Sequence, residues 1–316
     1  MKIKNLLFAL MGLFFVIISC SDDDDGGSSF DAAAQALIDD EKLIEYLQSH
    51  HYIPPEAGEV FGVIDTLTAE ETASPIFNDI EIKEITENDI NYKLYYLVNN
   101  AGKNSNPSIT DSILVNYRGF LLDSTRFDER LTYTWLPLTN VIRGWQFGFE
   151  LFKDGDNTTP PNEPLQFSDT GNGILFLPSG LAYGNGGTVS IGPNEPLLFF
   201  INLGLVERAD HDGDTLLSIY EDVDSSKNVN DDNTDNDQLP DYLDVDDDGD
   251  GVLTRDELVQ TVYVISFTDE EPVLGANEFE YYRIRDEQAE TITIYTTTVV
   301  DSNNDGTPDY LDPNTN

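Results

Sequence analysis

The acidic residues of this chain are concentrated after residue 209, and this distribution limits what the C-terminal part can fold into. The chain carries 60 Asp and Glu against 16 Lys and Arg among 316 residues, a formal net charge of −44. Two carboxylates about 4 Å apart repel each other by roughly 1–4 kcal/mol in partly aqueous surroundings, so dense clusters are avoided unless a cation neutralises them. The excess of acid also argues against a nucleic-acid partner, because phosphate binding requires Lys and Arg.

Within this part of the chain, residues with oxygen ligands recur at the spacing of calcium-binding loops. The segment 246–257 matches the loop template in full, with ligands at positions 1, 3 and 5, Gly at 6, a backbone carbonyl at 7 and Glu at 12. Three further loops match in part, with Thr215 and Gln238 at the Gly position of two of them. The expected ligands are Asp210, Asp212, Asp214 and Glu221; Asn233, Asp235, Asp237, Asp241 and Asp244; Asp246, Asp248, Asp250, Val252 (through its carbonyl) and Glu257; and Asp301, Asn303, Asp305, Asp309 and Asp312.

The loops at 233–244 and 301–312 resemble thrombospondin type 3 repeats, and the loop at 246–257 resembles that of an EF-hand. The resemblance implies structural Ca²⁺, since the flanking helices of a sensor EF-hand are not evident. The alternative is a disordered acidic tail, which the regular spacing disfavours. Two strands, at 262–265 and 291–295, are expected in the segment 258–300, whose sequence suggests no family.

The N-terminus is expected to export and anchor the chain. A basic start precedes an apolar run, Leu6 to Ile18, that is too short to span a bilayer comfortably. The run ends in Ile17-Ile18-Ser19-Cys20, which resembles a bacterial lipobox in which Cys20 is lipidated. We therefore expect a signal peptide at 1–19, an acidic and Gly/Ser-rich tether at 20–30, and an outer-membrane anchor on the periplasmic or surface side. An ordinary secretory signal is the alternative.

The segment 31–91 is expected to form a helical leader followed by the first strand of a hairpin. Asp31 can cap a helix that ends before Pro54-Pro55. The strands at 80–85 and 92–98 alternate apolar and polar residues around a turn. The leader would act as a spacer packed on the next domain or as a dimerisation arm. The apolar positions expected on one face of its helix are Ala33, Leu37, Ile44 and Leu47.

The segment 92–207 predicts an α+β domain, in which an antiparallel sheet wraps around one short helix near Trp145. Strands are expected at 112–120, 133–136, 173–177 and 197–206, with an inserted surface loop at 154–172. Its motifs, taken in order, resemble those of the FKBP-type peptidyl-prolyl cis-trans isomerases. They are Val115-Asn116-Tyr117-Arg118-Gly119, Arg126-Phe127-Asp128, Val141-Ile142-Arg143-Gly144-Trp145, Leu181-Ala182-Tyr183-Gly184 and Leu198-Phe199-Phe200.

The resemblance implies a pocket with a role for each matching residue, although each aromatic taken singly also fits an ordinary core. Catalysis would need no cofactor. The loop between Asp128 and Tyr133 is shorter than in compact members of the family, so Trp135 competes with Tyr133 as the next pocket aromatic. The implied roles are Trp145 as the floor, Tyr117, Phe127 and Phe199 as walls, Tyr183 and Asp128 as polar groups, Val141 and Ile142 at the rim with the Ile142 N–H holding a substrate carbonyl, Tyr133 as a further wall, and Ile191 overhanging the pocket.

Together these patterns predict an exported, lipid-anchored, FKBP-like prolyl isomerase with a calcium-stiffened C-terminal extension. Its substrates would be exported polypeptides that contain proline. The rival hypothesis is a non-catalytic module that grips a partner segment in the same pocket. The expected boundaries are 1–19, 20–30, 31–91, 92–207, 210–257, 258–300 and 301–312.

Overall fold

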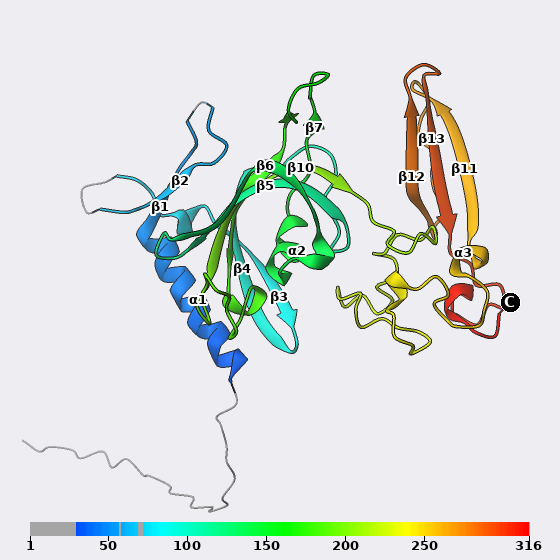
Figure 1. Ribbon diagram of the computed structural model, residues 1–316, viewed down its shortest axis with the longest axis horizontal. Coiled ribbons are helices and arrows are strands. Elements are labelled where there is room, and N and C mark those ends of the chain that lie inside the picture. Colours follow the sequence, from blue (N-terminus) through cyan, green and yellow to red (C-terminus); the bar gives the residue numbers. More distant parts are fainter. Residues whose placement is uncertain (1–29, 57, 69–71, 316) are drawn as a thin grey trace, which may run out of the picture. The chain divides into compact units, whose positions relative to one another are not determined.

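The computed structural model describes residues 30–56, 58–68 and 72–315 (Figure 1). The expected signal peptide, most of the tether and the lipidation site Cys20 lie outside the described residues. No helix in the described ranges combines the length and the apolar character needed to cross a bilayer.

The larger part of the fold is a six-stranded antiparallel sheet with the order β3-β4-β9-β10-β5-β6. The short helix α2 lies on one face of this sheet and the longer helix α1 on the other (Figure 1). The predicted α+β class is confirmed. The elements are α1 (Ala32–Ser49), β1 (His50–Ile53), β2 (Val63–Thr66), β3 (Glu81–Glu87), β4 (Ile90–Asn100), β5 (Ser112–Leu121), β6 (Arg126–Pro137), α2 (Arg143–Phe149), β7 (Asp156–Asn157), β8 (Phe167–Ser168), β9 (Gly171–Leu177) and β10 (Leu197–Glu207).

The predicted hairpin is present as β3 and β4. Its turn residues Asn88 and Asp89 have positive φ angles of 50° and 62°, a geometry that favours Asn and Asp in two-residue hairpin loops. The hairpin joins the main sheet because β4 also pairs with β9. The sheet therefore runs across the boundary expected between 91 and 92.

Helix α1 forms where expected, and half of the face predicted to be buried is covered. Leu47 is fully buried and Ile44 packs against the core, whereas Ala33 is exposed and Leu37 is 69% exposed. The buried face is rotated because it includes the polar residue Asp39, whose carboxylate accepts hydrogen bonds from the backbone N–H and the hydroxyl of Ser179. A pattern based on apolar residues alone misses such an anchor. The helix packs on the sheet through Leu43, Tyr46, Leu47, Ile174, Phe176 and Phe200.

Two glycines allow α2 to lie close to the opposite face of the sheet. A Cβ atom at Gly144 would lie 2.7 Å from Leu177 Cδ1, and one at Gly148 would lie 2.5 Å from Leu175 Cδ1. Such distances leave no room for a side chain. The close approach fixes the position of Trp145, which is 4% exposed and belongs to the core between α2 and the sheet.

Strand β6 is longer than the sequence suggested. It begins at Arg126, so Asp128 lies within a strand and the expected loop before Tyr133 is instead an irregular stretch of β6. The pairing with β5 shifts register between the partners of Val115 and Tyr117, which accommodates the extra residues. The inserted segment 154–172 contains the short β7–β8 hairpin.

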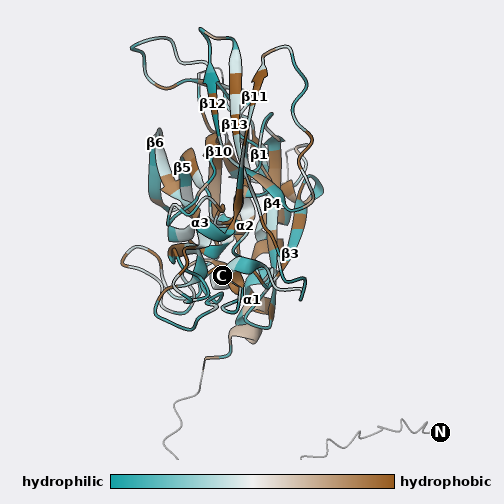
Figure 2. Ribbon diagram, turned by 90° about the vertical axis from the view of Figure 1, so that its right-hand side faces the viewer, coloured by the Kyte–Doolittle hydropathy of each residue, from teal (hydrophilic) through white to brown (hydrophobic). Residues whose placement is uncertain are grey.

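The C-terminal part contains acidic loops and a three-stranded antiparallel sheet of order β11-β13-β12. The two predicted strands are confirmed as parts of β11 and β13. The third strand was missed because its charged and aromatic residues, from Glu278 to Asp286, lack a clean apolar alternation. Figure 2 shows hydrophobic residues along the strands and mostly hydrophilic loops. The elements are α3 (Thr254–Glu257), β11 (Val259–Ser266), β12 (Glu278–Asp286) and β13 (Thr291–Thr298).

Candidate functional site

A cavity of about 310 Å³ opens between α2 and strands β5, β6 and β10. Its lining combines aromatic rings with one carboxylate and two phenols. It brings together eight of the ten residues that the sequence assigned to a pocket. The lining residues are Tyr117, Phe127, Asp128, Leu136, Asn140, Val141, Ile142, Trp145, Tyr183 and Phe199.

Four aromatic rings form a connected group in this cavity. Trp145 makes edge-to-face contacts with Tyr117 and Phe199, with ring centroids 4.8 Å and 5.1 Å apart. Phe127 meets Phe199 at 5.4 Å in the same manner. Such packing holds the rings in fixed orientations. The adjacent strands β5 and β10 place Tyr117 and Phe199 side by side, and α2 supplies Trp145.

The polar side of the cavity is organised around Asp128. The hydroxyl of Tyr117 donates to Asp128 Oδ2 over 2.7 Å, and the backbone N–H of Glu129 donates to Asp128 Oδ1 over 2.8 Å. Arg130 Nη1 lies 3.6 Å from Oδ1. Burial raises the pKa of Tyr117, and the hydrogen bond to Asp128 raises it further. Burial and the nearby Asp128 also raise the pKa of Tyr183. Both phenols therefore remain donors well into the alkaline range.

Two nitrogen donors at the cavity are without acceptors. The indole Nε1 of Trp145 is buried and has no partner within the described residues. In the same described part of the chain, the backbone N–H of Ile142 donates to no acceptor, while the Ile142 carbonyl accepts from Trp145 and Gln146 at the start of α2. The Ile142 N–H is thus free to bind a peptide carbonyl.

Tyr133 and Ile191, the other two residues assigned to the pocket, are not among the residues that line the cavity. Tyr133 packs against Phe167 with centroids 4.7 Å apart, and its hydroxyl accepts a hydrogen bond from Asn202. The irregular stretch of β6 turns it away from the cavity-lining group. Ile191 is 3% exposed and belongs to the core. Trp135, the alternative, also lies outside the lining group. Sequence reasoning missed Leu136 and Asn140, which lacked a motif of their own.

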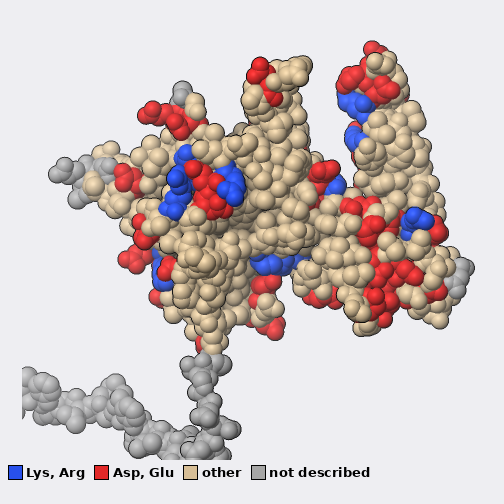
Figure 3. All heavy atoms as spheres, viewed as in Figure 1, with Lys and Arg blue, Asp and Glu red and all other residues tan. Residues whose placement is uncertain are grey.

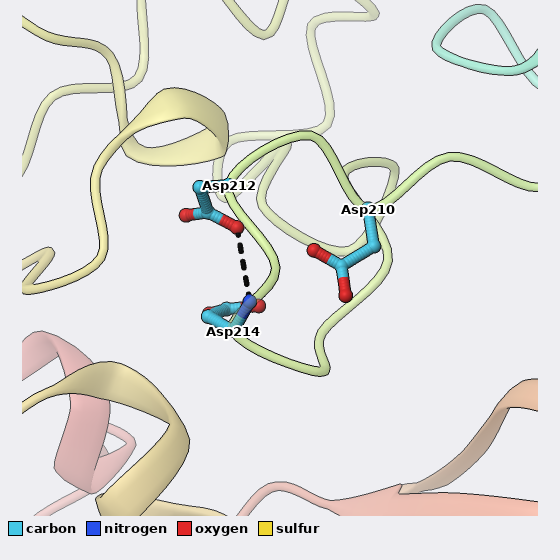
Figure 4. Close-up of side chains that lie close together, drawn as sticks. All are labelled: Asp210, Asp212 and Asp214. Carbon is cyan, nitrogen blue, oxygen red and sulfur yellow. Dashed lines mark hydrogen bonds between the residues drawn. The ribbon is translucent and has the colours of Figure 1, made fainter.

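The acidic part gathers three carboxylates from each of three predicted ligand sets, without Glu257 and with Glu221 in a separate group. Groups of carboxylate oxygens within 4.8 Å of one another are formed by Asp210, Asp212 and Asp214; by Asp235, Asp237 and Asp244; and by Asp246, Asp248 and Asp250. Figure 3 shows acidic side chains gathered over this part of the chain, and Figure 4 shows the first set arranged around one turn of the backbone.

Three of the four predicted loops have the same hydrogen bond between loop positions 6 and 1. The backbone N–H at position 6 donates to the carboxylate at position 1, as from Gly251 to Asp246 over 3.2 Å and from Thr215 to Asp210 over 3.1 Å. Thr215 has φ 81°, the left-handed conformation for which the template uses Gly. The loop geometry of the template therefore persists at a residue other than Gly.

A further loop with the same bond was missed in the sequence. Lys227, with φ 64°, donates its N–H to Asp222 over 3.0 Å. Its carboxylates Asp222, Asp224 and Asp232 lie within 4.8 Å of one another. Asp222 and Asp224 match positions 1 and 3 of the loop template, but Lys227 stands at position 6, where the template has Gly, so the sequence pattern was not recognised.

Some predicted ligands are not gathered with the others. Asp241 accepts from the N–H and the hydroxyl of Thr234, and Asp309 accepts from the N–H of Ser302. The loop at 301–312 shows no group of three carboxylates within the described residues. Its Asn303 amide donates to Asp305 and Asp312. Asn233 and Val252 are absent from the carboxylate groups by their chemistry, since they would bind through an amide and a backbone oxygen.

Several of these carboxylates are buried. Glu221 is fully buried, and burial together with the carboxylates of Asp214 and Asp212 raises its pKa to about 11. Burial raises the pKa of Asp247 to about 9 and that of Glu257 to about 8. Desolvation penalises an unpaired carboxylate, so in the absence of a cation these groups hold protons. Oxygen-rich clusters of this kind fit Ca²⁺.

Comparisons with known proteins relate parts of the chain to two kinds of sequence. Residues 211–278 match a family model described as BamM C-terminal. The chain is 36% identical over 124 residues to the FKBP-type peptidyl-prolyl cis-trans isomerase FkpA of Aeromonas hydrophila, which covers 38% of this chain and 41% of that relative. It is 34% identical over 119 residues to the peptidyl-prolyl cis-trans isomerase Mip of Coxiella burnetii, covering 36% and 45%. Part of the chain is thus related to FKBP-type isomerases.

A third relative and one solved structure are similar over comparable lengths. The outer membrane protein MIP of Legionella longbeachae is 32% identical over 122 residues, covering 37% of this chain and 45% of the relative. The crystal structure of FkpA from Escherichia coli shares 32% identity and covers 39% of this chain and 51% of that chain, with a TM-score of 0.31. The chain therefore spans less than half the length of each curated relative named here.

Proposed function

We propose that this chain is a peptidyl-prolyl cis-trans isomerase that assists the folding of exported polypeptides, and that its cavity beside α2 is the active site. The observation that carries the proposal is the aromatic cavity itself, floored by Trp145 and walled by Tyr117, Phe127 and Phe199. The partial relationship to FKBP-type isomerases supports it.

The chemistry requires no covalent intermediate and no cofactor. Resonance in the peptide bond opposes rotation by about 18–20 kcal/mol, and X–Pro bonds exchange over tens to hundreds of seconds. Twisting the bond removes the resonance, so the carbonyl becomes less polar and the proline nitrogen becomes pyramidal. A dry aromatic cavity favours this twisted state over the planar one. A thousandfold acceleration needs only about 4 kcal/mol of selective stabilisation.

The polar groups of the cavity would hold the peptide in place. The free N–H of Ile142 would donate to a substrate carbonyl, and the Tyr183 hydroxyl would donate to a neighbouring one. Asp128, oriented by Tyr117, would lie beside the twisting carbonyl. No histidine lies between residues 92 and 207, so the site has no imidazole for acid–base chemistry.

A protease-coupled exchange assay on an apolar-X-Pro peptide tests the activity. The purified chain should accelerate cis-to-trans exchange, and the double variant Asp128→Ala, Phe199→Ala should lose most of the gain. Peptide binding should be measured in parallel by fluorescence of Trp145. Binding without any acceleration would refute catalysis and favour the non-catalytic binding module.

The cellular location belongs to the same proposal. A lipidated Cys20 would anchor the chain in the bacterial cell envelope, on the outer membrane. The name of one relative, an outer membrane protein, is consistent with the envelope. Proline-containing exported polypeptides would then reach the cavity outside the cytoplasm.

The acidic loops would bind Ca²⁺ in a structural role. The support is geometric: three carboxylates from each of three predicted ligand sets are gathered, and the loops at 210–221 and 246–257 close with the hydrogen bond from position 6 to position 1. An ion-binding fold of this kind resembles EF-hand and thrombospondin type 3 loops. Equilibrium dialysis of the purified chain against radioactive calcium tests it, with Mg²⁺ in excess as the competitor. Retention of no calcium would refute it.

A further inference from the structure

Three carboxylates from two separate loops, two of them buried, meet in the C-terminal part of the chain. Oxygens of Asp212, Glu221 and Asp247 lie within 4.8 Å of one another. Glu221 is 0% exposed and Asp247 is 1% exposed. Both carboxylate oxygens of Glu221, both of Asp247 and Oδ2 of Asp212 have no hydrogen-bond partner within the described residues.

Asp247 is not a ligand in the loop template of its own segment. It occupies position 2 of the loop at 246–257, between the gathered residues Asp246 and Asp248. Those two carboxylates group with Asp250, whereas Asp247 groups with Asp212 and Glu221 of the other loop. Its backbone N–H is fixed by a bond to the Thr254 hydroxyl. The Asp247 side chain therefore lies with the carboxylates of the loop at 210–221 rather than with those of its own loop.

Within the described part of the chain, no Lys or Arg forms an ion pair with Asp212, Glu221 or Asp247. Residues 208–257 contain only three Lys and Arg, and each pairs with another carboxylate: Arg208 with Asp111, Lys227 with Glu150 and Arg255 with Asp256. Burying carboxylates that are neither paired nor hydrogen-bonded is strongly unfavourable. A bound cation removes this penalty, because it supplies the missing partner for every orphaned oxygen.

We propose that the Ca²⁺ ion of the loop at 210–221 takes Asp247 as an additional ligand and so links that loop to the loop at 246–257. This inference rests on the proposed calcium binding by the acidic loops. Ca²⁺ accepts six to eight oxygen ligands, so it has room for a carboxylate from outside a twelve-residue loop. The ion then acts as a cross-link between two loops that are separate in the sequence.

Counting bound ions in single and double variants tests the shared site. Equilibrium dialysis of the purified chain with calcium alone should show that Glu221→Gln and Asp247→Asn each remove one ion, or weaken one ion at least tenfold. The double variant should lose the same single ion. The matched control is Asp256→Asn, which removes an equal charge from an exposed residue of the same loop and should bind as the unaltered chain does.

The outcomes distinguish the proposed cross-link from the proposed binding of calcium by the acidic loops. Loss of two ions in the double variant would assign Asp247 to its own loop and overturn the cross-link, as would unchanged binding in Asp247→Asn. Retention of no calcium by the unaltered chain would overturn both proposals.

Thermal unfolding in the presence of a chelator tests whether the Asp247→Asn substitution disturbs the fold itself. Because Asp247→Asn replaces a buried carboxyl group that has no hydrogen-bond partner with a neutral group of the same shape, its metal-free form should melt no lower than the unaltered chain. With calcium, it should melt lower. A lower melting temperature in both conditions would show that Asp247 acts in packing, and would also overturn the cross-link.

Discussion

The hydroxyl of Tyr117 lies 2.7 Å from Asp128 Oδ2 and donates a hydrogen bond to it. The two residues stand on adjacent strands, β5 and β6, at the mouth of an aromatic cavity. Tyr117, which forms one wall of the cavity, thus orients Asp128, the one carboxylate among the lining residues. Within the proposed mechanism, Tyr117 is a residue that contributes both a ring surface and a positioning hydrogen bond.

Tyr117→Phe should keep the ring and lose the bond. Hydrogen bonds to charged groups contribute about 1.5–3 kcal/mol, so we expect kcat/KM to fall by roughly tenfold or more. Tyr133→Phe is the matched control, because its hydroxyl bonds Asn202 outside the cavity. Equal losses in both variants would show that the effect comes from folding rather than from Asp128.

The midpoint of any alkaline fall in the proposed isomerase activity should lie above about pH 10. An ordinary tyrosine is half ionised there, but burial and Asp128 raise the pKa of Tyr183, and burial also raises that of Tyr117. Activity should persist to higher pH because only the protonated phenol can donate a hydrogen bond, and a raised pKa keeps the phenol protonated at higher pH. A fall in kcat/KM with its midpoint below about pH 10 would contradict this, with circular dichroism as the check on folding.

Gly148→Ala should destabilise the fold. The added Cβ would lie 2.5 Å from Leu175 Cδ1, and overpacking of this kind typically costs about 1–3 kcal/mol. Gly186→Ala is the control, since its nearest neighbour would be 3.8 Å away. Urea unfolding of both variants measures the difference, and equal midpoints would disprove the tight contact between α2 and the sheet.

If the acidic loops bind calcium as proposed, its removal should open the acidic part and leave the proposed isomerase activity in place. Without metal, repulsion among carboxylates such as Asp246, Asp248 and Asp250 favours an open chain, whereas bound metal contributes folding free energy. Limited proteolysis in chelator should cut residues 210–316 while 92–207 survives. Full loss of activity on chelation would show instead that the loops support the cavity directly.

Cys20→Ala should release the chain from the membrane fraction or leave it unprocessed. The motif ending in Cys20 predicts acyl chains on that residue, so the unaltered protein should partition into detergent. Intact-mass analysis of the mature N-terminus measures this. An unmodified N-terminus at any other residue would rule out the anchor.

The sequence by itself identified those cavity residues that lie within a short local motif. Trp145, Tyr117 and Phe199 each lie in a short recognisable segment, and the strands and helix that hold them follow from local patterns. The calcium-loop spacing likewise predicted the gathering of Asp246, Asp248 and Asp250, because these residues are two apart and turn geometry alone brings them together, whereas the predicted ligand Glu257 is not part of the group.

Tertiary structure alone decided the contacts that depend on distant segments. The register shift of β6 took Tyr133 out of the cavity, and the buried bond between Asp39 and Ser179 set which face of α1 is covered. The approach of Asp247 to Glu221 joins two loops whose separate patterns contain no sign of it. Spacing along a chain encodes the geometry of one turn, strand or helix, whereas the packing of separate segments depends on the shapes and charges of all the surfaces that meet.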